Sequence, residues 1–312
     1  MYNDWFIKFA PMAYRETRVQ TTRDVESTLH KTDNLTNVGA AILRREPGVL
    51  PTLRMSTCPP LAVDRLVGLA GVSKNLVGLM EEGKLPVRMH AAALETDLNK
   101  IGTTIEKMAD PDIFVWLGRA SAPTEVEIRR AATIVADRLC GSVANPIIRN
   151  AQEKRQLAAI GEWLKARGYR PIPDQAKFNA MPSGTFGFRM NVPVKREDGG
   201  STNIPVDTIV MPKTASPGEL PLMIEAKSAG DFTNVNKRRK EEAQKINQLC
   251  NTHGKDRVRF ILFLCGYFDS GYLGYEAAEG IDWVWEHRID GNCSGPTDGS
   301  IARKAHGALR ES

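Results

Sequence analysis

The sequence contains few residues that could build a disulfide framework or a zinc site. It has five cysteines, and no two of them are spaced as Cys-x-x-Cys. An odd number of scattered cysteines favours reduced, buried thiols over disulfides or structural zinc. The five histidines also lack the spacing of metal ligands. The cysteines are Cys58, Cys140, Cys250, Cys265 and Cys293.

Long apolar runs and nucleotide-binding loops are absent as well. The longest apolar run, residues 260–268, is far too short to cross a bilayer. The N-terminal sequence MYNDWFIKFA lacks the basic start and the long apolar segment of a secretory signal. No glycine-rich loop ends in Gly-Lys-Ser or Gly-Lys-Thr, which argues against an ATP-driven motor. We therefore expect a cytoplasmic protein that has no membrane partner.

What the chain does contain is the composition of a globular protein. Its 312 residues are 42% hydrophobic and 25% charged, and they suffice for one large domain or two ordinary ones. A total of 42 Lys and Arg residues against 37 Asp and Glu residues gives a net charge of +5. This mild excess permits a polyanionic partner but does not require one.

Hydrophobic periodicity divides the chain into a helical part and a part of mixed structure. Helical spacing dominates roughly the first 140 residues, and short apolar runs with turn-rich connections follow. This order predicts an α/β fold of the α+β type, with a mixed central sheet flanked by helices and a helical N-terminal region. The predicted helices near the change are 123–139, which ends at Cys140-Gly141-Ser142, and 148–166, which follows Pro146. The predicted strands are 186–194, 203–211, the segment PLMIEAK at 221–227, and 257–266, with a charged amphipathic helix over 234–249.

Charged residues interrupt two of the predicted strands. Asp207 lies in the first, and Glu225 and Lys227 end the second, 225 − 207 = 18 residues further along. Alternation along a strand places Glu225 and Lys227 on one face, and a hairpin pairing would put Asp207 beside both. Carboxylate oxygens suit Mg²⁺, and the metal would compensate the charge that burial penalises. The set predicts metal-assisted hydrolysis of a phosphodiester, in which the lysine positions water or offsets negative charge.

An ion pair at a surface strand end is the alternative interpretation of Glu225 and Lys227. The Glu-x-Lys pattern alone is weak, because Glu82-Gly83-Lys84 also matches it near a predicted helix end. Only residues 205–227 combine an acid, a spacer, an apolar run and Glu-x-Lys in that order. That order favours the metal site.

The same residues resemble a known nuclease signature. Pro205-Val206-Asp207 followed by Glu225-Ala226-Lys227 resembles PD-(D/E)xK, from which it departs by the valine between proline and aspartate. The stretches IEAKSAGDFTNVNKRRKEEAQK and GYEAAEGIDWVWEHRID resemble the XamI family of type II restriction endonucleases. The resemblance covers about residues 60–290. It implies a PD-(D/E)xK restriction-endonuclease-like core in which Asp207 and Glu225 bind Mg²⁺ and Lys227 is the catalytic lysine.

The resemblance also implies an activity and partners. A type II restriction endonuclease hydrolyses double-stranded DNA at a specific short sequence with Mg²⁺. A homodimer is implied, because a two-fold protein matches a two-fold site, and a cognate DNA methyltransferase is implied with it. Two alternatives stay open: a DNA repair, resolvase or mobile-element nuclease of the same fold, and a catalytically inactive DNA-binding protein.

Three segments are predicted on this basis. Residues 1–142 form a helical N-terminal region with possible DNA-recognition helices, and residues 143–290 form the nuclease core. Residues 291–312 form a flexible tail that is rich in glycine and serine.

A third acid could come from the helix that precedes the sheet. In nucleases of this fold such a helix often contributes an acid, and Glu153 stands about one turn into the predicted helix, which has Leu157, Ile160 and Leu164 on its packing side. The alternative is a solvated glutamate that stabilises the N-terminus of that helix. Glu153 is therefore a candidate third metal ligand.

DNA contacts are predicted in two places. The basic run Lys237, Arg238, Arg239 and Lys240 opens the helix after the lysine strand, where it suits phosphate contacts, although a solvated helix face is the alternative. Residues 61–85 resemble a helix-turn-helix, with Ser73 as N-cap and Lys74 beginning the second helix. A plain helical hairpin has the same spacing.

Overall fold

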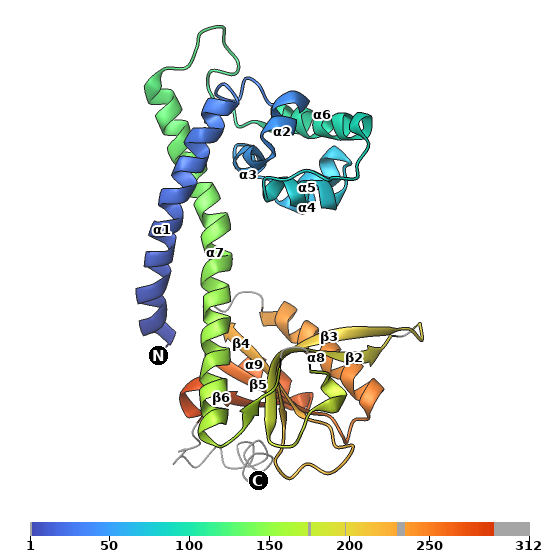
Figure 1. Ribbon diagram of the computed structural model, residues 1–312. Coiled ribbons are helices and arrows are strands. Elements are labelled where there is room, and N and C mark those ends of the chain that lie inside the picture. Colours follow the sequence, from blue (N-terminus) through green and yellow to red (C-terminus); the bar gives the residue numbers. More distant parts are fainter. Residues whose placement is uncertain (1, 174–175, 197, 230–234, 290–312) are drawn as a thin grey trace. The chain divides into compact units, whose positions relative to one another are not determined.

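A computed structural model describes residues 2–173, 176–196, 198–229 and 235–289, and over 235–241 it describes the backbone alone. Within these ranges the chain forms nine α-helices and six strands (Figure 1). The predicted tail 291–312 lies outside the described residues. The helices are α1 (Tyr2–Lys31), α2 (Ala40–Arg45), α3 (Leu50–Met55), α4 (Val63–Ala70), α5 (Lys74–Glu81), α6 (Ala91–Met108), α7 (Glu125–Ala166), α8 (Val235–His253) and α9 (Ser270–Ala278). The strands are β1 (Arg170–Pro171), β2 (Thr185–Lys195), β3 (Ser201–Met211), β4 (Leu222–Ala229), β5 (Arg259–Gly266) and β6 (Asp282–Trp285).

The chain divides into two compact units. The helical unit comprises Ile7–Ile148, and the sheet unit comprises Met1–Phe6 together with Arg149–Ser312. Helices α1 and α7 contribute residues to both units. The division gives each unit a core of its own, and the roles predicted for segments 1–142 and 143–290 stay predictions.

The helical unit is built around one apolar cluster. Helices α2 to α6 each bury part of an apolar stripe in it, as their helical spacing predicts. A buried arginine, Arg54 on α3, forms a two-point ion pair with Glu81 at the end of α5 and donates to the carbonyl of Leu61. This arrangement satisfies a charge that would otherwise be costly to bury. The fully buried members include Leu43, Leu50, Leu53, Leu66, Leu76, Met80, Leu98 and Ile101.

The prediction of two helices separated near residues 140–146 is wrong. Helix α7 runs without interruption from Glu125 to Ala166 and contains Pro146. Proline inside a helix removes one backbone N–H, which usually breaks or kinks the helix. The helix is mostly exposed around Pro146, where Val143 and Ile147 are 39% and 43% exposed, and buried side chains stand at Ala144 before it and at Gln152 further along. The helix nevertheless continues through Pro146, so the local signal for a break is not decisive here.

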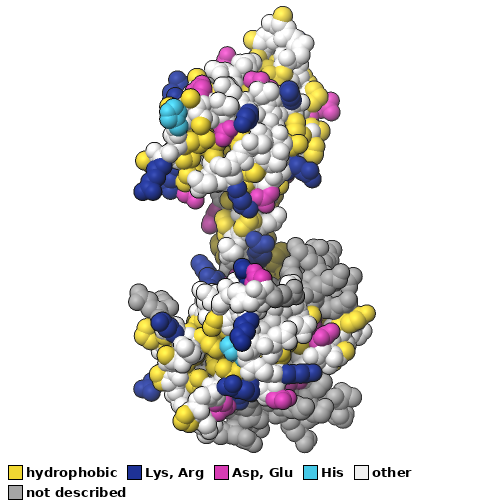
Figure 2. Space-filling view, turned by 90° about the vertical axis from the view of Figure 1, so that its right-hand side faces the viewer, with side chains coloured by type: hydrophobic (Ala, Val, Ile, Leu, Met, Phe, Trp, Pro, Cys, Tyr) yellow, Lys and Arg dark blue, Asp and Glu magenta, His cyan; other side chains and the backbone are white. Residues whose placement is uncertain are grey.

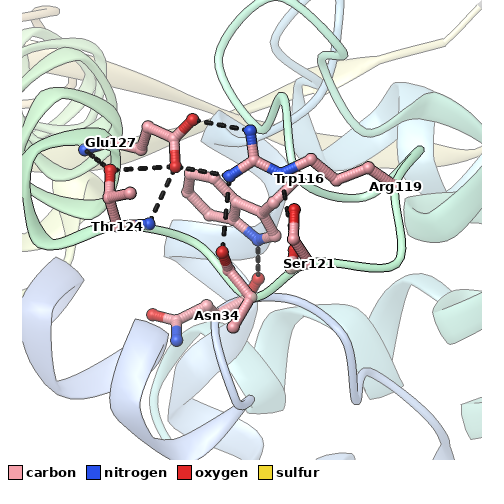
Figure 3. Close-up of polar contacts among 7 residues, drawn as sticks. Asn34, Trp116, Arg119, Ser121, Thr124 and Glu127 are labelled. Carbon is pink, nitrogen blue, oxygen red and sulfur yellow. Dashed lines mark hydrogen bonds and ion pairs between the residues drawn. The ribbon is translucent and has the colours of Figure 1, made fainter.

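The start of α7 is held by a reciprocal cap (Figure 3). Glu127 accepts hydrogen bonds from the backbone N–H of Thr124 at 2.8 Å and from its hydroxyl at 3.0 Å, and its own N–H donates to Thr124 Oγ1 at 3.3 Å. Arg119 adds two contacts to the same carboxylate, at 2.8 and 2.6 Å. These bonds, above all those from Arg119, lower the pKa of Glu127 to about 2. The stabilisation is present above the ordinary pKa near 4.5 and is lost as the pH falls toward 2.

The sheet unit contains one six-stranded sheet with strands in the order β1-β2-β3-β4-β5-β6. Strands β2, β3 and β4 pair antiparallel, whereas β4, β5 and β6 run parallel, as do β1 and β2. The predicted hairpin, the apolar strand PLMIEAK, the charged helix and the following buried strand are all confirmed. The predicted α+β architecture, a mixed sheet flanked by helices with a helical N-terminal region, is confirmed with them.

Different helices cover the two faces of the sheet (Figure 1). Leu157, Ile160 and Leu164 of α7 pack against one face, where Leu222 and Ile224 of β4 meet them. Leu249 of α8 and Tyr272 of α9 pack against the other face with Met223. Strand β4 is therefore buried on both sides, as its continuous apolar run predicts. None of the helices in the described ranges is both long and apolar enough to cross a membrane.

The cap of α7 leads to a first prediction. Thr124→Ala removes the hydroxyl that joins the cap, and we expect the free energy of unfolding at pH 7 to fall by about 1 kcal/mol. Chemical denaturation with far-UV circular dichroism measures this loss. Thr133→Ala is the matched control, since its exposed hydroxyl only donates to the Arg129 carbonyl within the same helix. An equal loss in both variants would mean that the cap contributes nothing.

Candidate active site

Asp207 and Glu225 lie next to each other on adjacent antiparallel strands. The register pairs Thr208 with Ile224, so one further step places Asp207 across from Glu225. The contact is direct at the backbone, because the N–H of Ala226 donates to Asp207 Oδ2 at 2.9 Å. Glu225 is buried, at 8% exposed. The structure thus brings together the two acids that the sequence pattern singled out.

The proximity of the two carboxylates has an electrostatic consequence. Burial, followed by the negative charge of Glu225, raises the pKa of Asp207 to about 6. The carboxyl group therefore keeps its charge less readily than a solvated aspartate. A divalent cation between the two acids would remove this repulsion, and carboxylate oxygens are the ligands that Mg²⁺ prefers. The donor set fits a hard divalent metal.

Lys227 joins this pair from the same strand. Its Nζ lies 3.3 Å from Glu225 Oε1 and 3.3 Å from Glu242 Oε1 of α8. Burial acts to lower the pKa of Lys227, but the charges of Glu225 and Glu242 outweigh it and leave the pKa above its ordinary value. The lysine is therefore a cation held between two carboxylates. The alternative of a solvent-exposed strand-end pair does not fit, since the side chain of Glu225 is only 10% exposed.

Helix α8 supplies a second lysine that the sequence pattern missed. Lys245 Nζ lies 2.6 Å from Glu225 Oε2, and its side chain is 14% exposed. Glu242 and Lys245 are three residues apart and therefore share a face of the helix. Both side chains face β4, where Lys245 pairs with Glu225 and Glu242 pairs with Lys227. Their spacing to the buried Leu249 is the signal that could have identified them.

Helix α7 braces the same strand from the other face of the sheet. The side-chain amide of Gln156 donates to the carbonyl of Lys227 at 3.2 Å and to that of Phe263 in β5 at 3.4 Å. Gln156 is 1% exposed. The amide thus ties two neighbouring strands together at the residue that carries the lysine.

Glu153 occupies a different position from the two acids. It forms an ion pair with Arg189 of β2, at 2.7 Å from Oε1 to Nη2, and its side chain is 34% exposed. The register pairs Phe188 with Thr208 and Met190 with Val206, which places Arg189 opposite Asp207. Within the part of the chain that the structure describes, no three His, Cys, Asp or Glu residues come close enough to hold a metal together. Glu153 is also far inside α7, so the alternative of a helix-terminal glutamate is removed.

The residues predicted to contact DNA are described only in part. The side chains of Lys237, Arg238, Arg239 and Lys240 lie outside the described residues, although α8 begins at Val235 and includes their backbone. Their contact with DNA stays a prediction.

The pair of helices predicted for residues 61–85 is present as α4 and α5. Gly71 ends α4 with φ +61°, and Ser73 caps α5 by accepting from the N–H of Leu76 at 3.1 Å. Lys74 is 75% exposed and pairs with Asp64 at 2.9 Å. Lys and Arg side chains of the helical unit are spread over the face drawn in Figure 2 among acidic and hydrophobic ones. Charge alone therefore does not mark α5 as the DNA-reading helix.

Comparison with known proteins gives a family. The profile described as XamI restriction endonuclease matches residues 33–285. The curated protein "Type II restriction enzyme SalI" of Streptomyces albus G is 53% identical over 294 residues, which are 93% of this chain and 92% of that protein. The crystal structure of protein VC1899 from Vibrio cholerae is 11% identical with a TM-score of 0.29. The match covers 79% of this chain and 53% of that structure's chain.

Proposed function

Because the chain belongs to the XamI family of restriction endonucleases, we propose that Asp207, Glu225 and Lys227 carry out its cleavage of DNA. Membership establishes the activity: the chain is a type II site-specific deoxyribonuclease, and such enzymes generally use a divalent metal. This excludes the alternatives of a repair, resolvase or mobile-element nuclease. The proposal concerns the residues, the identity of the metal and the partners.

One observation supports this site above others. A buried carboxylate, that of Glu225, and a half-buried one, that of Asp207, lie opposite each other on β4 and β3, and the pKa of Asp207 is raised to about 6 in part by the charge of Glu225. Such an arrangement is costly unless a cation is bound, which points to function. The lysine beside them completes the chemistry that phosphodiester hydrolysis needs.

Each side chain has a definite part in the proposed mechanism. Asp207 and Glu225 would hold Mg²⁺, which when bound supplies Lewis acidity toward the phosphate and a water of lowered pKa. Lys227 would orient the attacking water by a hydrogen bond and offset negative charge on the phosphate. Glu153 stays a candidate third acid, supported by its pairing with Arg189 beside Asp207.

DNA binding and assembly complete the proposal. The run from Lys237 to Lys240 would contact phosphates, since it begins the helix that carries Glu242 and Lys245 to the site. Ser73 and Lys74, which begin α5, would contact the DNA. The cleavage site itself would be in the sheet unit. A homodimer would match a two-fold recognition sequence, and a cognate methyltransferase would protect the cell's own copies of it. Both proteins would act in the cytoplasm, where the DNA is.

The test of the activity starts from DNA of known sequence. Purified protein and plasmid DNA with Mg²⁺ should give discrete fragments whose sequenced ends share one short symmetric site. Asp207→Asn should give no fragments, because it removes one of two anionic ligands while keeping the shape of the side chain. Glu162→Gln, an exposed change on α7, is the control and should cut normally. Full activity of Asp207→Asn would move the metal site elsewhere.

Lys227→Arg separates a catalytic lysine from a structural cation. The guanidinium keeps the charge but is larger, planar and effectively never deprotonated, so it cannot replace an ammonium beside a metal-bound water. Cleavage of a duplex that carries the determined site should slow by at least about a hundredfold, the scale of one positioned proton-transfer group. Binding of that duplex in Ca²⁺, measured by fluorescence anisotropy, should be unchanged. Near-normal cleavage would show that Lys227 only compensates charge, and Lys195→Arg at an exposed position of β2 is the control.

A further inference from the structure

Helix α8 carries a buried acid that lies outside the nuclease signature. Glu242 is 1% exposed, so its carboxylate is almost completely removed from water. Burying such a charge costs several kcal/mol unless partners compensate it. The partners of Glu242 therefore indicate what the residue is for.

The two oxygens of Glu242 have different partners. Oε1 lies 3.3 Å from Lys227 Nζ, and Oε2 accepts a hydrogen bond from the hydroxyl of Tyr272 on α9. The contact with Lys227 is an ion pair that lacks the alignment of a hydrogen bond, since Oε1 has no hydrogen-bond partner among the described residues. Attraction between charges carries this contact, and it depends on Glu242 being ionised.

A second buried acid lies close enough to Glu242 to be affected by its charge. Glu276 of α9 is 1% exposed, and burial together with the charge of Glu242 raises its pKa to about 8. Glu276 is therefore mostly protonated at neutral pH. Glu242 has the better partners for a negative charge, namely the ammonium of Lys227 and the hydroxyl of Tyr272. Both of these partners contact Glu242, so its carboxylate is the group that faces Lys227.

We infer that Glu242 is a positioning residue for cleavage, which fixes the Lys227 ammonium through a carboxylate that is not a proposed metal ligand. The inference rests on the proposed function of Asp207, Glu225 and Lys227. If Glu225 were the only partner of Lys227, a metal ion bound to Glu225 would compete with this ion pair. The ion pair with Glu242 involves no proposed metal ligand, so it holds Lys227 in place when the metal binds. Tyr272 in turn fixes the orientation of Glu242.

Glu242→Gln tests this role, because it keeps the volume and an oxygen for Tyr272 while removing the charge. The single-turnover rate on a duplex with the determined site should fall about tenfold to a hundredfold, as for a misplaced catalytic group. The affinity for that duplex in Ca²⁺ should match that of the Glu162→Gln control, at a temperature where both proteins are folded by far-UV circular dichroism. Glu242→Asp, which restores the charge, should recover part of the rate. A Glu242→Gln rate equal to the control would overturn the inference.

A double-mutant cycle with Lys227→Met shows whether Glu242 acts through the lysine. If it does, Glu242→Gln should add no further loss to the residual rate of Lys227→Met, measured with excess enzyme. A full additional loss would assign Glu242 a role independent of Lys227 and overturn the inference. Normal cleavage by Lys227→Met would contradict the proposed function itself, so the two failures are distinct.

Tyr272→Phe decides the matter if Glu242→Gln does not fold. It removes only the hydroxyl that orients Glu242 and keeps the ring in its buried position. We expect a rate several-fold lower with unchanged DNA affinity in Ca²⁺. An unchanged rate would count against positioning through Glu242.

Discussion

The compensation of buried carboxylates by lysines between β4 and α8 is the interaction on which the site depends. Its contacts run without a gap from Lys245 through Glu225 and Lys227 to Glu242 and Tyr272. Opposite charges alternate along this series. Glu225 lies between Lys245 and Lys227, and Lys227 lies between Glu225 and Glu242, whose other oxygen accepts from the hydroxyl of Tyr272. Removal of one member leaves its neighbours with uncompensated charge, which is much more costly in a buried site than at the surface. The arrangement therefore constrains where the strand and the helix can lie.

The fold meets this constraint by the order of its elements. Strand β4 is followed along the chain by α8 and then by β5, which pairs parallel to β4. The helix thereby returns over the face of the sheet to which Glu225 and Lys227 point. On the opposite face, α7 fixes β4 through the amide of Gln156 at the backbone of Lys227. The lysine is thus held by its side chain from one face and by its backbone from the other.

The sequence could predict the strands and the acids in them, because a period of two and an apolar run ending in charge are local signals. It could not identify Glu242 and Lys245, which stand in a helix so rich in charge that a solvated face is the natural interpretation. Their burial is a tertiary effect of packing against β4 and α9. The wrong division of α7 has a local cause, since Pro146 and the small residues before it suggest a break that the helix does not show. For Glu153 the sequence predicted a helix before the sheet, but not its partner Arg189, which comes from a distant strand.

Direct binding of a metal ion tests the central claim most closely. Titration of the DNA-free protein with Mn²⁺, followed by electron paramagnetic resonance, should reveal a site in the wild type and in Glu162→Gln. Both Asp207→Asn and Glu225→Gln should bind Mn²⁺ at least about tenfold more weakly, since each removes an anionic ligand. Wild-type affinity in both variants would contradict the assignment of the metal to the acid pair on β3 and β4.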